Sequence, residues 1–145
     1  MLNNMVKFFP SIVLSIAAIL LCLGGLDFLW FSVISGDWYS MQMGSLMRET
    51  LIVWPWGVFY LMYGGVVFVL AVVANRDKPL YYAAIDGALL GLASYGAYNL
   101  TNYSILAGFP LTIALIDWAW GIFLTAASAA CGWIGFQSIR KREPQ

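Results

Sequence analysis

The sequence predicts an all-α integral membrane protein: a bundle of four transmembrane helices with both termini in the cytoplasm and a short amphipathic segment after the first helix. Of the 145 residues, 62% are hydrophobic and 10% are charged, and the mean hydropathy is +0.82. A soluble domain carries about 25% charged residues, so this chain has too few charges to cover a surface that faces water. Four long apolar runs and an uneven distribution of basic residues complete the prediction.

The first apolar run covers about residues 9–34 and exceeds the roughly 20 residues needed to cross a bilayer. Pro10 suits its first turn, where a missing backbone N–H costs nothing. We interpret the run as an uncleaved helix rather than a secretory signal, because it continues to about Ile34 without a cleavage site of small residues. The amphipathic residues 35–50 follow, and their aromatic side chains indicate a segment at the membrane–water interface.

Three further apolar runs follow, at about residues 51–74, 80–102 and 111–139. Trp54-Pro55-Trp56 near the start of the second run indicates an interfacial anchor and a helix start or kink. The charged residues 75–79 predict a tight turn, and Gly108 with Pro110 predicts the next one. No repeat or linker divides the chain, so residues 1–145 are expected to form one domain.

The basic residues gather on one side of the membrane if four helices alternate across it. That side holds Lys7, Arg76, Lys78, Arg140, Lys141 and Arg142. Only Arg48 falls on the other side. By the positive-inside rule both termini then face the cytoplasm, and the loops at 35–50 and 103–110 face outward. We therefore expect a multi-pass protein of the bacterial inner membrane.

Some classes of site and partner are not expected. The chain has no His, which is the commonest general base and metal ligand, and its net charge of zero argues against a nucleic-acid partner. Cys22 and Cys131 fall in apolar runs and are predicted at different depths, roughly 15 Å apart at 1.5 Å rise per residue, as separate free thiols. We expect no metal site and no cofactor.

The polar side chains within the apolar runs define the candidate site. Two acids lie roughly 10 Å inside the outer ends of the first and fourth helices, and amides and hydroxyls end the third helix in the same half of the membrane. The predicted polar pocket comprises Asp27, Trp30, Tyr95, Tyr98, Asn99, Thr101, Asn102, Asp117 and Trp120. Asp86, nearer the cytoplasmic end of the third helix, is a second candidate acid.

Small residues recur at helical spacing on two of the predicted helices. The two sets are Gly87 and Gly91 on the third helix, and Gly121, Thr125 and Ser128 on the fourth, in line with Asp117. Small side chains let transmembrane helices approach closely. We therefore expect these faces to pack inside the bundle.

The two outer acids admit two interpretations. An Asp at the centre of a membrane helix costs about 2.5–3.5 kcal/mol, and such a residue is a functional candidate by default. Alternatively, Asp27 and Asp117 join helices by accepting hydrogen bonds from Trp, Tyr or Asn side chains, or remain protonated. The Tyr and Asn residues of the third helix also admit a structural interpretation, as an ordinary helix end at the interface.

One string of motifs resembles a known family. It consists of Tyr95, Tyr98-Asn99-Leu100-Thr101-Asn102, Gly108-Phe109-Pro110, Ile116-Asp117 and Trp120-Gly121, with an upstream Asp27 and Trp30. This string resembles the hallmark of an uncharacterised bacterial membrane-protein family, the domain of unknown function 2177. The resemblance implies a four-helix membrane protein and brings no established activity.

Three functions remain open at the level of sequence. The first is a structural or accessory subunit, not an enzyme, that binds membrane lipid, other membrane-protein subunits or a second copy of the chain through the outer polar pocket. The alternative is a proton-linked small-molecule transporter that uses Asp27 and Asp117. The third is a lipid-modifying enzyme of the outer leaflet, in which an acid lies near hydrogen-bond donors.

Overall fold

The structure is a computed structural model that describes residues 2–140, without the side chains of residues 2–7 and Ser45, and every regular element in this range is helical. The elements are α1 (Leu2–Leu29), η1 (Trp30–Ile34), α2 (Gly36–Met43), η2 (Gly44–Leu46), α3 (Trp54–Val67), η3 (Phe68–Val72), η4 (Val73–Asn75), α4 (Leu80–Ile105) and α5 (Leu111–Arg140). η1 and η3 are π-helical turns that continue α1 and α3. Lys141 and Arg142 of the predicted basic group lie outside the described residues.

Three helical segments are long and apolar enough to cross a membrane: Phe8–Ile34, Trp54–Asn75 and Leu111–Arg140. Because a bilayer core needs about 20 helical residues, each of them meets the requirement. α4 has 26 residues and is as long, but it carries more polar side chains than the other three. The chain is therefore an all-helical protein of the membrane-embedded type.

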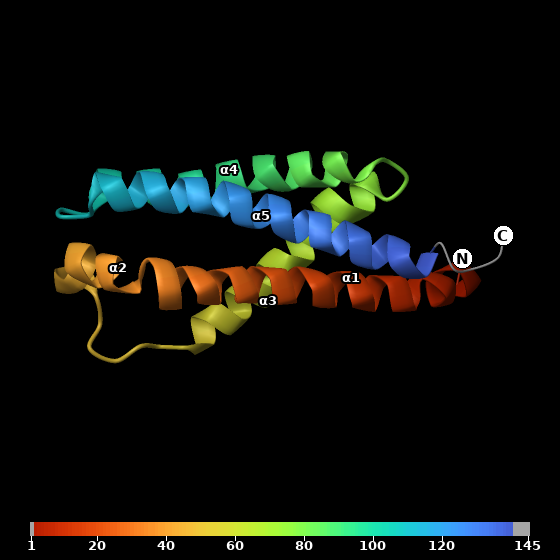
Figure 1. Cartoon of the computed structure of the whole chain (residues 1–145), viewed down its shortest axis with the longest axis horizontal. Helices are drawn as coiled ribbons and strands as arrows, with labels where there is room; N and C mark the ends of the chain where they lie inside the picture. The colour runs from red at the N-terminus through yellow and green to blue at the C-terminus, as the bar shows by residue number, and fades with distance from the viewer. Residues whose placement is uncertain (1, 141–145) are drawn as a thin grey trace.

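The long helices run side by side, and α5 packs against α4 on one side and against α1 on the other (Figure 1). α1 begins and α5 ends at one end of the bundle, which we call the terminal end. The opposite end, formed by α2 and the turn between α4 and α5, is the loop end. That turn depends on Gly108, whose φ of +87° is a conformation that residues with a side chain rarely adopt.

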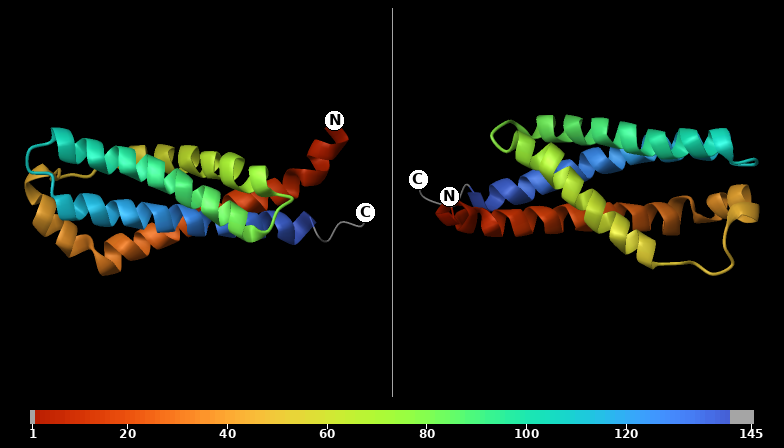
Figure 2. Two further views of the ribbon diagram at one scale, coloured as in Figure 1. Left: turned by 90° about the horizontal axis from the view of Figure 1, so that it is seen from above. Right: turned by 180° about the vertical axis from the view of Figure 1, so that it is seen from behind.

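α3 crosses the other helices obliquely and follows only part of their length (Figure 2). The apolar run begins at Leu51, but the helix begins three residues later at Trp54, with Pro55 in its first turn, where the ring is tolerated. Gly64 lets α3 approach α1 closely, since a Cβ atom there would lie 2.9 Å from Leu20 Cδ2. The loop end is consequently built mainly from α1, α2, α4 and α5.

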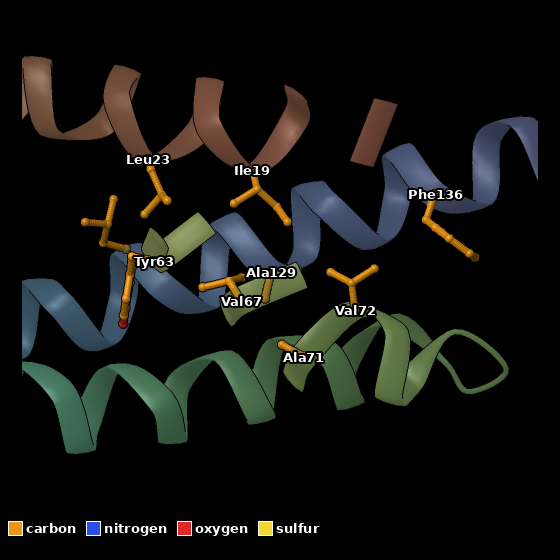
Figure 3. Packing of buried hydrophobic residues seen from close by; sticks show 9 residues of the cluster. Ile19, Leu23, Tyr63, Val67, Ala71, Val72, Ala129 and Phe136 are labelled. Carbon is orange, nitrogen blue, oxygen red and sulfur yellow. The ribbon is translucent and has the colours of Figure 1, made fainter. Parts of the chain in front are cut away.

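The apolar core lies where α3 and η3 pass between the other helices (Figure 3). Its buried members are Ile19, Leu23, Tyr63, Val67, Ala71, Val72, Leu124, Ala129 and Phe136. Tyr63 also places a hydroxyl in this core, 2.9 Å from Ser94 Oγ and 2.9 Å from Thr125 Oγ1. This one phenol therefore connects α3 to both α4 and α5.

The small residues predicted to pack inside the bundle do so between α4 and α5. A Cβ atom on Gly87 would lie 2.8 Å from the backbone oxygen of Thr125, and one on Gly91 would lie 2.5 Å from that of Gly121. Ser128 is also fully buried. The two backbones are thus close enough that only glycine fits at these positions of α4.

The predicted separation of the two cysteines is wrong. Cys22 and Cys131 line the same groove between α1 and α5. The prediction placed each residue by counting from the assumed ends of its apolar run. In the structure the antiparallel packing of α1 on α5 sets the register instead, and it brings the two thiols to one level.

The turn between η4 and α4 is fixed at the terminal end by the last turns of α5. The Gln137 amide and the Arg140 guanidinium both donate to the backbone oxygen of Arg76. Arg140 also pairs with Asp77, and this hydrogen bond is the main reason why the pKa of the Asp77 carboxyl lies below its usual value. The basic residues of this end therefore hold the turn as well as carrying charge.

Candidate functional site

Asp27 is almost completely buried, with 7% of its surface exposed, and it joins three helices. Its Oδ2 accepts a hydrogen bond of 2.8 Å from the hydroxyl of Tyr60 on α3. Its Oδ1 accepts one of 3.0 Å from the indole N–H of Trp120 on α5. Both carboxylate oxygens of this α1 residue therefore have protein donors from different helices, as a buried acid requires.

Asp117 is held in the same way by two other elements. Asn99 of α4 donates its side-chain amide to Oδ2 at 2.7 Å, and Tyr39 of α2 donates its hydroxyl to Oδ1 at 3.0 Å. Burial, and then the neighbouring Asp117 carboxylate, raise the pKa of Tyr39, so its phenol keeps the proton that it donates. α2 reaches this position because its aromatic side chains pack on Phe109 and Ile113 at the start of α5.

The two acids belong to one polar cluster at the loop end. Trp120 is one helical turn from Asp117 and donates to Asp27, and its ring stacks on Trp30 with centroids 4.5 Å apart. Tyr95 lies near both carboxylates and covers Gly121 with its ring. We define the loop-end cluster as Asp27, Trp30, Tyr39, Tyr60, Tyr95, Asn99, Asp117 and Trp120.

Two buried atoms of the loop-end cluster have no hydrogen-bond partner: Asn99 Oδ1 and Trp30 Nε1. The orientation of the Asn99 amide is well determined, because its nitrogen donates to two acceptors, Asp117 Oδ2 and the backbone oxygen of Tyr95. Its oxygen is therefore a free acceptor on a side chain that is 0% exposed. Trp30 supplies the complementary donor: its N–H lies near the Tyr39 phenol but forms no well-aligned hydrogen bond.

Other predicted site residues lie at the edge of this cluster or outside it. Tyr98 is 58% exposed but lies near the Asp117 carboxylate, and Thr101 is exposed on the surface of α4. Asn102 is half-buried, and its backbone oxygen accepts the N–H of Leu106 at the end of α4. Asp86 lies toward the terminal end, where it accepts a hydrogen bond from the side-chain amide of Asn75.

Sequence reasoning missed two donors of the cluster, Tyr39 and Tyr60. Tyr39 was predicted only as part of an interfacial segment. Tyr60 and Tyr63 are three residues apart on one face of a helix that has few other polar groups, and a buried phenol usually needs a partner. That spacing was the available signal for an inward-facing polar stripe on α3.

The acids of the cluster are hydrogen-bonded within the protein. Each carboxylate accepts two hydrogen bonds from other side chains, which fill about half of its roughly four lone-pair positions. Within residues 2–140, no three His, Cys, Asp or Glu side chains come together as metal ligands. The cluster also holds one neutral acceptor, Asn99 Oδ1, and one neutral donor, Trp30 Nε1, without a well-aligned hydrogen bond.

Comparison with known proteins agrees with the membrane assignment. Residues 12–134 match the family of predicted membrane proteins DUF2177. No curated protein and no solved structure matches the chain. Since the match covers most of the 145 residues, this chain belongs to the DUF2177 family of predicted membrane proteins.

Proposed function

We propose that the protein is a small accessory subunit of the bacterial inner membrane that binds a membrane lipid through the loop-end cluster. The observation that carries this proposal is the pair of buried atoms without partners, Asn99 Oδ1 and Trp30 Nε1. Buried polar groups are nearly always hydrogen-bonded, and leaving one without a partner costs about 1–3 kcal/mol. A bound ligand that supplies both bonds would remove this cost.

The two free atoms also describe the ligand. Asn99 Oδ1 needs a donor and Trp30 Nε1 needs an acceptor, and a hydroxyl group is both. The carboxylates of Asp27 and Asp117 nearby would repel an anionic phosphate. The head group that fits best is therefore uncharged and carries at least one free hydroxyl group, as in a glycolipid.

A proton-linked transporter is supported less well. Such a carrier needs an acid that exchanges partners during transport, whereas Asp27 and Asp117 are each bonded to two side chains from other elements. These bonds favour the interpretation in which the acids join helices. The lipid-modifying enzyme would need a reactive group beside the ligand, and the free groups of the cluster are a neutral amide oxygen and an indole.

The proposal includes a topology in which α4 is the fourth transmembrane helix, both termini are cytoplasmic and the loop end faces outward. It rests on the basic side chains of the terminal end. In a Cys22→Ser/Cys131→Ser background, we expect a membrane-impermeant maleimide to label Ser104→Cys in intact cells and Lys78→Cys only after lysis. The reverse pattern would contradict this orientation.

Lipid binding is tested by Trp30→Phe. The substitution keeps an aromatic ring against Trp120 but removes an N–H that lies near the Tyr39 phenol without forming a well-aligned hydrogen bond, so the protein should remain folded. The probes are a monoglycosyl diacylglycerol and phosphatidylcholine, which lacks a free hydroxyl, in mixed micelles. We expect the glycolipid to raise the melting temperature of the wild type and to bind Trp30→Phe about fivefold more weakly, as the loss of one hydrogen bond implies.

The control substitution is Trp118→Phe, on α5. Trp118 donates its N–H to the backbone oxygen of Leu92 and is not part of the loop-end cluster. Its glycolipid affinity should equal that of the wild type. Equal stabilisation by both lipids, or unchanged glycolipid affinity in Trp30→Phe, would refute the proposed site.

A further inference from the structure

Cys22 of α1 and Cys131 of α5 meet in a groove on the lipid-facing side of the bundle. The groove has a volume of about 570 Å³, and its other lining side chains are mainly aliphatic, among them Leu14, Ala18, Leu21 and Ile134. Both cysteines are free and half-buried, and both line this groove. Neither the loop-end cluster nor the proposed lipid site uses them.

The helix register shows independently that the pair is level. α1 and α5 are in close contact at Ala18, since a Cβ atom on Gly135 would lie 3.3 Å from Ala18 Cβ. In antiparallel helices a step of four residues forward on one matches a step of four back on the other. From Ala18 and Gly135, that step leads to Cys22 and Cys131.

We propose that Cys22 and Cys131 form a dithiol site that a lipid-soluble quinone oxidises to a disulfide between α1 and α5. In this reaction both S–H bonds break and one S–S bond forms. The two electrons and two protons pass to the quinone, which leaves as the hydroquinone. The aliphatic groove excludes charged oxidants such as glutathione disulfide, because a charge is costly to transfer into hydrocarbon, while an uncharged quinone is soluble there.

The reaction would link the two helices covalently at mid-length. α1 is joined to α5 near this point by a hydrogen bond from Ser15 to the backbone oxygen of Gly132 and by packing of Ile19 against Gly132. A disulfide closing a loop of this length would stabilise the bundle further. The state of the quinone pool would thereby set how firmly α1 is held.

The test uses the full-length protein in membrane vesicles treated with decylubiquinone. Thiols that remain free are blocked with N-ethylmaleimide, and disulfides are then reduced and tagged with a maleimide-polyethylene glycol. We expect two tags per wild-type chain, and none in Cys22→Ser or in Cys131→Ser. Hydroquinone should form in equal amount to the disulfide.

The matched control moves the thiol to another face of α1 at nearly the same depth. Leu20 points toward Gly64 of α3, so the variant Cys22→Ser/Leu20→Cys keeps two thiols but separates them. It should gain no tags. The proposal is overturned if the wild type also gains none, if its disulfides join two chains, or if the control oxidises as fast as the wild type.

Discussion

Gly91→Leu is expected to separate α4 from α5 and to destabilise the protein by about 3 kcal/mol, at the upper end of the usual cost of overpacking. A Cβ atom at this position would lie 2.5 Å from the backbone oxygen of Gly121 and 2.9 Å from Thr125 Oγ1. The Thr125 side chain could rotate away from the new leucine. The backbone of α5 at Gly121, however, cannot move without breaking its other contacts. The melting temperature of the purified protein in mild detergent, followed by Trp fluorescence, measures the effect.

The same exchange at Gly65 is the matched control. Gly65 lies on α3, and a Cβ atom there would meet nothing within 4 Å. Gly65→Leu should therefore melt close to the wild type, whereas Gly91→Leu should melt well below it. Similar melting temperatures for both variants would show that close approach of α4 and α5 does not hold the bundle together.

Asp27→Ala is expected to lower the free energy of unfolding by about 2 kcal/mol. The substitution removes the acceptor that the Tyr60 hydroxyl and the Trp120 indole N–H use among the described residues. Interhelical hydrogen bonds in membrane proteins are worth about 0.6–1.7 kcal/mol each, and two are lost here. Asp27→Asn keeps one acceptor oxygen and should lose about half as much. Titration with a denaturing detergent, followed by circular dichroism, gives these values.

A double-mutant cycle with Tyr60→Phe shows whether the carboxylate acts through its α3 partner. The double variant should cost less than the sum of the two single losses. It removes both members of the Asp27–Tyr60 hydrogen bond, whereas each single variant leaves one member without its partner. Asp37→Ala, at an exposed position of α2, controls for the loss of an acid as such. If the losses of unfolding free energy in Asp27→Ala and Tyr60→Phe simply add, the hydrogen bond between Tyr60 and Asp27 is contradicted.

The candidate site was partly predictable. Asp27 and Asp117 stand out in the sequence because acids are rare in apolar runs, and counting residues from the helix ends placed Asn99 in the same half of the membrane. Tyr98 and Thr101 belong to the same dense motif, yet they lie on the exposed side of α4. Periodicity gives the relative faces of residues on one helix, but which face turns inward depends on the neighbouring helices.

Two partners of the acids were not predicted from the sequence. Tyr39 and Tyr60 come from elements whose orientation is determined by packing: α2 folds back on the start of α5, and α3 crosses obliquely. The level of Cys22 with Cys131 likewise depends on the register of two helices far apart in the chain. Counting residues from the end of an apolar run cannot supply a register.

The sequence by itself determined that this chain is helical and embedded in a membrane, because composition and run length follow directly from the cost of placing backbone and charge in hydrocarbon. It also determined the turns, through Gly108 and the charged residues before α4. The tertiary structure alone decided which side chains meet, since contacts between distant helices depend on crossing angle and register. Crossing angle and register place Tyr60 beside Asp27 and Tyr39 beside Asp117, and they place Cys22 and Cys131 in one groove.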